Sequence, residues 1–192
     1  MEALPAGPPP APRNQLIVGT TLASVALLML TGGMLAVWSL QRTQAIDSAG
    51  TWLPSSVTIP EVPSNVMLIA FIAIITFAHW AIWSAQRSDT ANTVFALAAT
   101  AFVAILLINA QAFIYARMDL SVTDGAYGSM FFAITGTYMA LLVIGVIFSL
   151  VATFRFLGGR TRDRELLTAH AIYWYAMAVA FAAIWFVVYV TK

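Results

Sequence analysis

The sequence predicts an all-α integral membrane protein, folded as one bundle of five transmembrane helices. Of its 192 residues, 61% are hydrophobic and 9% are charged, whereas soluble domains have about 45–50% apolar and about 25% charged residues. A soluble fold of this size would have to expose much of that apolar surface to water, and a lipid bilayer removes this cost. Five separate stretches are apolar and long, and none has a charged residue well inside it.

Each of these stretches has the length that a bilayer requires. About 20 mostly apolar residues, each adding about 1.5 Å, cross the hydrocarbon, and a charged side chain at mid-membrane costs about 2.5–3.5 kcal/mol on insertion scales. The predicted spans are residues 16–40, 65–85, 93–116, 127–154 and 166–190. They define a predicted transmembrane domain over residues 16–192.

The segments outside the spans are short or irregular. Residues 1–15 are rich in proline and lack the basic start of a signal peptide. They predict an extended, solvated arm, which either touches a partner or remains a disordered tail. The longest connection, residues 41–64, contains Pro54, Pro60 and Pro63. It predicts an ordered loop at the membrane surface.

The basic residues predict the orientation. With five spans, the N-terminal arm, the second loop and the fourth loop share one side of the membrane. That side carries six of the nine basic residues, namely Arg13, Arg87, Arg155, Arg160, Arg162 and Arg164. The other side carries Arg42, Arg117 and Lys192. The positive-inside rule therefore places the N-terminus in the cytoplasm and the C-terminus outside.

Several kinds of chemistry are excluded or disfavoured. The chain has no cysteine, which excludes disulfides and thiolate-ligated metals, and its net charge of +1 gives no sign of a nucleic-acid partner. Its two histidines, His79 and His170, have no carboxylate or thiolate to support them, so we expect no metal or haem site. We expect instead one histidine packed between helices and one at the membrane interface.

The interior of the predicted bundle contains few polar groups. Asn109 and Gln111 are two residues apart on one helix, so they point about 200° apart and do not form one site. Each predicts an interhelical hydrogen bond. Because there is no polar seam through the spans, the pattern is not typical of a transporter or proton pathway.

One segment is more specific than the composition. It reads Asp124-Gly125-Ala126-Tyr127-Gly128-Ser129, followed by Phe131-Phe132 and Thr135-Gly136. Asp124-Gly125 predicts a tight turn, and the glycines let the loop lie close to the helix that follows. With Ser121 at its first position, the segment resembles the signature of haem-copper (cytochrome c) oxidase subunit III. In that family a loop reading S-x-x-D-G-x-Y-G-S leads into a span beginning F-F-x-x-T-G.

Other pieces occur in the order that the resemblance implies. Residues 111–115 look like the family's Q-A-Y-E-Y, His79-Trp80 is similar to part of W-A-H-H, and residues 172–175 are similar to the Y-W-H opening of the last span. The resemblance covers about residues 30–190. It implies the five-helix form, which lacks the two N-terminal spans of longer members.

The departures from the family pattern are systematic. Turns and glycines remain, but the polar residues that the family has inside the membrane are replaced. The positions concerned are Leu27 and Ile114 for glutamates, Tyr138 and Leu141 for histidines, and Tyr175 and Ala178 for a histidine and an aspartate. The sequence therefore favours a scaffold role over an influence on proton uptake.

The resemblance implies a non-catalytic accessory subunit of an aerobic terminal oxidase, in the cell inner (plasma) membrane. It implies that the bundle stabilises catalytic subunit I and contacts other oxidase subunits of the respiratory chain. It also implies that the complex can join a respiratory supercomplex. Haem and copper are then expected in partner subunits, with no cofactor bound by this chain except phospholipid. His79, Trp80 and Arg155 are candidate lipid contacts, and Arg155 alternatively serves as an ordinary positive-inside anchor.

Three alternatives remain at this point. The first is an accessory subunit of a nitric oxide reductase-type complex, which the sequence hardly separates from an oxidase subunit. The second is a small transporter, which would need a polar seam. The third is an intramembrane enzyme, which would need clustered nucleophiles, metal ligands or carboxylates.

Overall fold

The computed structural model describes residues 14–54, 57–161 and 163–191, and over these residues the chain is helical apart from short connections. The helices are α1 (Gln15–Ala49), α2 (Glu61–Gln86), α3 (Thr90–Met118), α4 (Gly125–Leu157) and α5 (Arg164–Ile184), which continues as the π-helix η1 (Trp185–Val190). Within these residues, five helices are long and apolar enough to cross a membrane. The predicted fold class, an all-α multi-pass membrane protein, is therefore confirmed.

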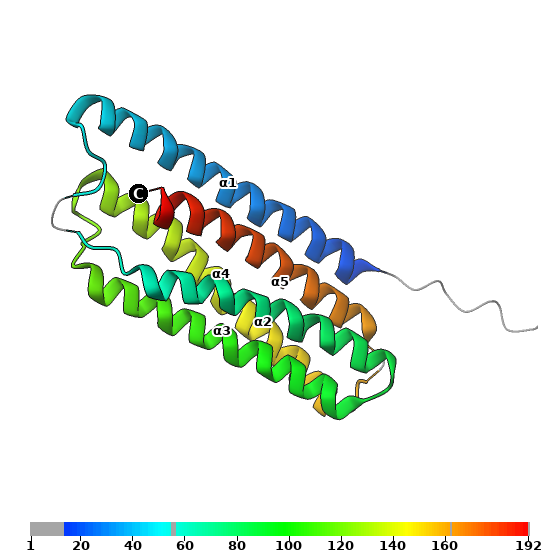
Figure 1. The fold of residues 1–192 in the computed structure, drawn as a ribbon. Coiled ribbons are helices and arrows are strands. Elements are labelled where there is room, and N and C mark those ends of the chain that lie inside the picture. Colours follow the sequence, from blue (N-terminus) through cyan, green and yellow to red (C-terminus); the bar gives the residue numbers. More distant parts are fainter. Residues whose placement is uncertain (1–13, 55–56, 162, 192) are drawn as a thin grey trace, which may run out of the picture.

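Helix α5 is the central element of the bundle (Figure 1). Helices α2, α3, α4 and α5 form a four-helix bundle in which sequential neighbours run antiparallel, and α2 closes the ring against α5. Helix α1 lies outside this ring and packs mainly along α5. Helices α1, α3 and α5 begin at the predicted inner end of the bundle, and α2 and α4 begin at the predicted outer end.

The predicted loop over residues 41–64 is wrong at both ends, because residues 41–49 belong to α1 and residues 61–64 belong to α2. Helix α1 continues to Ala49 instead of ending near residue 40, since residues 41–49 contain no proline or glycine to stop it. The helix ends at Gly50, which has a φ of 75° and donates its N–H to the Ile46 carbonyl at 2.9 Å. The connection to α2 is thus residues 50–60. Most of the predicted N-terminal arm, together with Arg13, Arg162 and Lys192, lies outside the described residues, while Gln15 already belongs to α1.

Two tyrosine hydroxyls join α4 to α5. Tyr138 donates to the Met177 carbonyl at 2.9 Å, and Tyr173 donates to the Leu141 carbonyl at 2.6 Å. Each bond runs from a side chain of one helix to the backbone of the other. The pair therefore fixes the relative height of the two helices as well as their separation.

The start of α1 is held by a carboxylate from α5. Asn14 provides no side-chain cap, and instead Glu165 Oε1 accepts the backbone N–H groups of Leu16 at 2.6 Å and Ile17 at 3.3 Å. Glu165 also lies in the first turn of α5. Because α1 and α5 begin at the same end of the bundle, one negative charge faces the positive ends of both helix dipoles.

We expect Glu165→Ala to lower the free energy of unfolding by about 1 kcal/mol, because two backbone donors lose their acceptor. The melting temperature of the chain in detergent, followed by circular dichroism, should fall by about 2–4 °C. Hydrogen exchange at the amides of Leu16 and Ile17 should accelerate. Glu165→Gln is the matched control, because its amide oxygen can accept the same bonds. Equal exchange rates in the wild type and the alanine variant would contradict this role.

Candidate functional site

The motif loop between α3 and α4 is a tight turn held by Asp124. The Asp124 carboxylate accepts the Ser121 N–H at 2.6 Å, and the Asp124 N–H donates back to the Ser121 carbonyl at 3.1 Å. Gly125 follows with a φ of 75°, a conformation that favours glycine, and donates its N–H to the Thr123 carbonyl at 2.8 Å. The Asp-Gly pair thus forms the turn that the sequence predicts.

Gly128 brings the first turn of α4 against this loop. It is buried, and a Cβ at this position would collide with the backbone carbonyl oxygen of Ser121. Ser129 is exposed and donates to Gly125 and Ala126 carbonyls of its own helix. Gly128 therefore has the close-approach role expected of a motif glycine, while Ser129 serves the helix start.

Tyr127 joins the motif to the other segments at the predicted outer end. Its ring lies 5.2 Å from that of Trp38 on α1 and 5.4 Å from that of Trp52 in the connection to α2, and the two indole rings are 5.2 Å apart. We call these three side chains the aromatic cluster. All three are buried, and their polar atoms have no hydrogen-bond partner among the described residues. Ring packing therefore holds the cluster.

The rest of the motif packs α4 against α3. Thr135 accepts the Tyr115 hydroxyl at 2.8 Å, and Phe132 lies 5.0 Å from the Tyr115 ring. Phe131 is fully buried. Gly136 differs from Gly128, because a Cβ there would meet nothing within 4 Å. This glycine leaves open space on the surface of α4.

The two histidines have opposite environments. His79 is exposed on α2, with Nδ1 3.2 Å from the Tyr175 hydroxyl of α5. His170 is fully buried, and its Nε2 lies 2.8 Å from Ser149 Oγ and 3.1 Å from Trp174 Nε1. His170 is thus the histidine packed between helices, although it lies near the start of its span, and the deeper His79 faces outward.

Trp80 packs beside His79 on α2. It is partly buried, and its ring lies 6.2 Å from that of Phe77 and 5.8 Å from that of Phe95 on α3. Within the described part of the chain, there is no group of three histidine, aspartate or glutamate side chains placed to hold a metal ion.

Arg155 lies in the last turn of α4, at the predicted inner end of the bundle, and forms an ion pair. Its Nη2 donates to Asp163 Oδ2 at 2.6 Å. It also lines a groove of about 370 Å³ with Arg160, Gly158 and the apolar side chains of Val151 and Phe154. The groove thus places two guanidinium groups beside an apolar wall at a helix end.

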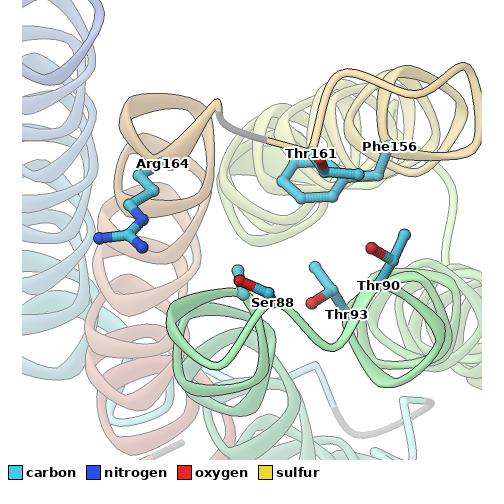
Figure 2. A pocket seen from close by; sticks show the side chains of 7 residues that line it. Ser88, Thr90, Thr93, Phe156, Thr161 and Arg164 are labelled. Carbon is cyan, nitrogen blue, oxygen red and sulfur yellow. The ribbon is translucent and has the colours of Figure 1, made fainter.

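A larger cavity of about 480 Å³ lies at the same end of the bundle (Figure 2). Its lining residues are Ala85, Ser88, Thr90, Thr93, Phe156, Thr161 and Arg164. Ser88 comes from the turn between α2 and α3, and Thr90 and Thr93 come from the first turn of α3, across from Phe156 and Thr161 (Figure 2). Arg164 projects from the start of α5 away from them.

Several polar groups beside this cavity are hydrogen-bonded within the protein. Thr93 donates to the Asp89 carbonyl at 2.7 Å and lies 3.0 Å from Ser84 Oγ. The Asp89 carboxylate caps α3, and the hydrogen bonds from the backbone and side chain of Asn92 hold the pKa of Asp89 below its ordinary value. The negative charge at the N-terminus of α3 is therefore supplied by the Asp89 carboxylate. Among the described residues, none of the lining hydroxyl groups is hydrogen-bonded to a histidine or carboxylate side chain.

Gln111 and Asn109 lie on opposite faces of α3, as their spacing predicts. Gln111 is buried and accepts the Tyr189 hydroxyl of η1 at 3.1 Å, which is the predicted interhelical bond. Asn109 is exposed and has no hydrogen bond to the described residues. For Asn109 the prediction is therefore not met within the chain, because its side of α3 has no neighbouring helix.

Three features of the structure are not evident from the sequence pattern: the Glu165 cap, the aromatic cluster and the contacts of His170. Each joins residues that are far apart in the chain. The tryptophan content was the available signal, but it equally predicts an interfacial belt.

Comparison with known proteins gives consistent matches. The family model described as cytochrome c oxidase subunit III matches residues 17–192. The cytochrome c oxidase subunit 3 of Arabidopsis thaliana is 28% identical over 152 residues, which are 76% of this chain and 56% of the relative. The cytochrome c oxidase subunit 3 of Wickerhamomyces canadensis is 28% identical over 143 residues, which are 70% of this chain and 52% of the relative. The chain thus spans about half the length of the curated relatives that it matches.

Proposed function

Because the chain belongs to the cytochrome c oxidase subunit III family, we propose that it is a non-catalytic accessory subunit of a haem-copper terminal oxidase. The family match over residues 17–192 is the observation that carries this proposal. The nitric oxide reductase alternative has no comparable support, since the relatives compared above are all named cytochrome c oxidase subunit 3.

The proposed role is structural. At three positions where the family resemblance implies ionisable groups, this chain has the buried apolar residues Leu27, Ile114 and Ala178. At a fourth, Tyr138 uses its hydroxyl to join α4 to α5. These residues pack the bundle, and none of the four is an acid or base suited to proton uptake.

The proposed partner is catalytic subunit I, together with other subunits that hold the haem and copper. The chain would lie in the cell inner membrane with its N-terminus in the cytoplasm, as its basic residues favour. Recovery of further respiratory complexes with it would extend this assignment to a supercomplex.

Phospholipid is the proposed ligand of the chain itself. Exposure of His79 beside Tyr175 gives the surface of α2 a polar pair that a headgroup or glycerol ester can contact, with Trp80 packed next to it. The groove of Arg155 and Arg160 offers positive charge above the apolar Val151 and Phe154. The Asp163 ion pair uses one nitrogen of Arg155, so we expect Arg160 to carry much of the attraction for phosphate.

Deletion of this subunit tests the proposal. We expect the complex purified through a tag on the catalytic subunit to keep its reduced-minus-oxidised haem spectrum, because the redox centres lie elsewhere. Its oxygen-consumption rate should start near that of the intact complex and decay faster during turnover. Restoring the wild-type chain should restore durability. Equal durability with and without the chain, or failure of the tagged chain to recover any haem protein, would contradict the proposed function.

A further inference from the structure

The outward face of α3 carries a polar side chain inside the hydrocarbon. Asn109 is exposed and lies five positions from the middle of α3 (Thr90–Met118). At about 1.5 Å per residue, it is about 7–8 Å from the helix midpoint, well within a hydrocarbon half-thickness of about 15 Å. A carboxamide facing lipid at this depth leaves two N–H donors and one carbonyl acceptor without partners.

Asn109 is unlike the other polar residues on the membrane-facing surface. Thr76 and Ser129 are exposed too, but each hydroxyl donates to a carbonyl of its own helix. His79 has the Tyr175 hydroxyl. Asn109 makes no hydrogen bond to any residue that the structure describes. Its amide therefore requires a partner from outside the described chain.

The surroundings of Asn109 fit a packed helix. Phe102 and Leu106 lie on one side of it along α3, with 62% and 49% of their surfaces exposed, and Phe113 lies on the other side with 45% exposed. Ala112 and Ala116 are exposed next to Phe113, and small residues let a second helix backbone approach closely. This face of α3 thus combines large apolar side chains, two small alanines and the hydrogen-bonding amide of Asn109.

The positively charged Arg117 lies near the C-terminal end of α3, on the same side of the helix as Phe113. Arg117 lies two helical turns beyond Asn109, about 12 Å along the axis, and its guanidinium carbon is 5.2 Å from the centre of the Phe113 ring. Arg117 forms no ion pair with a carboxylate of the described residues. The face therefore presents two polar groups at a fixed spacing.

We propose that this face of α3 binds one transmembrane helix of another subunit of the complex. The helix would carry an amide, hydroxyl or imidazole side chain opposite Asn109 and an Asp or Glu about 12 Å further out, opposite Arg117. A different subunit is favoured over a second copy, because the proposed function places this chain among other transmembrane subunits. The inference rests on the proposed function, since it needs a complex to bind.

Asn109→Leu in the intact complex tests the proposal. Loss of one interhelical hydrogen bond should weaken retention of the subunit in mild detergent about three- to tenfold. The melting temperature of the purified chain should stay unchanged, because Asn109 makes no hydrogen bond to the described residues. Thr76→Val is the matched control, since its hydroxyl is bonded to its own helix, and it should be retained like the wild type. Arg117→Gln should weaken retention more at low salt than at high salt.

A photo-reactive benzoylphenylalanine at position 102 identifies the occupant. We expect it to cross-link to a larger membrane subunit in the haem-containing complex. Normal retention of Asn109→Leu, or a cross-link only to lipid or to a second copy of this chain, would overturn the inference. If the wild-type chain recovers no haem protein at all, the proposed function fails instead, so the two failures are distinguishable.

Discussion

Trp38→Ala should destabilise the protein more than any other single change considered for this chain. The side chain is fully buried, and its ring contacts those of Trp52 and Tyr127 at 5.2 Å each. Removing a buried tryptophan typically costs about 3–5 kcal/mol, because a large cavity remains and the lining side chains lose their contacts. At this end of the bundle the cavity would separate α1 from both the motif loop and the connection to α2.

The melting temperature, followed by circular dichroism in detergent, should fall by about 10 °C for Trp38→Ala. Trp83→Ala is the control, because Trp83 is 47% exposed and its ring contacts the Arg87 guanidinium rather than the core. We expect this control to melt within a few degrees of the wild type. Equal shifts for both variants would show that the aromatic cluster has no special part in stability.

The second large effect is expected for Gly145→Ala on α4. A Cβ at this position would lie 2.8 Å from Trp174 Cη2 and 2.9 Å from Tyr173 Cε1, much closer than carbon atoms approach in folded proteins. Neither ring can move easily. Trp174 Nε1 donates to Ser149 Oγ at 3.1 Å, and Tyr173 donates to the Leu141 carbonyl. The added methyl group must therefore push α4 away from α5.

Overpacking of this kind costs about 1–3 kcal/mol, so the melting temperature should fall by several degrees. Gly136→Ala on the same helix is the matched control. A Cβ there meets nothing within 4 Å, and alanine favours helix over glycine by about 0.5–1 kcal/mol. This control should melt at the same temperature or slightly higher. A tolerated Gly145→Ala would mean that α4 and α5 are less tightly joined than described.

Sequence patterns predicted the fold class because the bilayer imposes a length and an apolar composition on every span. They were less informative about where helices end. Hydropathy falls at residue 40, but the backbone of α1 remains helical to Ala49, since helix formation outside the membrane depends on backbone propensity and on the Gly50 cap. The start of the surface loop predicted for residues 41–64 was wrong for that reason.

In the candidate site, the sequence predicted features formed by residues close together in the chain better than contacts between different helices. The Asp124-Gly125 turn and the close approach at Gly128 follow from residues within one loop, so the motif predicted them. Which side chains face inward depends on where neighbouring helices lie. Spacing separated Asn109 from Gln111 but did not tell which of them faces the bundle, and depth alone did not tell which histidine is buried.

The cap on α1 has a consequence for the order of events on the ribosome. Glu165 lies 149 positions after Leu16, and the main neighbour of α1 is α5, which is made after the other four described α-helices. At about 5–20 residues per second, α1 enters the bilayer about 7–30 s before its acceptor carboxylate and its principal packing surface exist. The hairpins of α2 with α3 and α3 with α4 can form in that interval, so among the described helices α1 docks last although it is translated before the others.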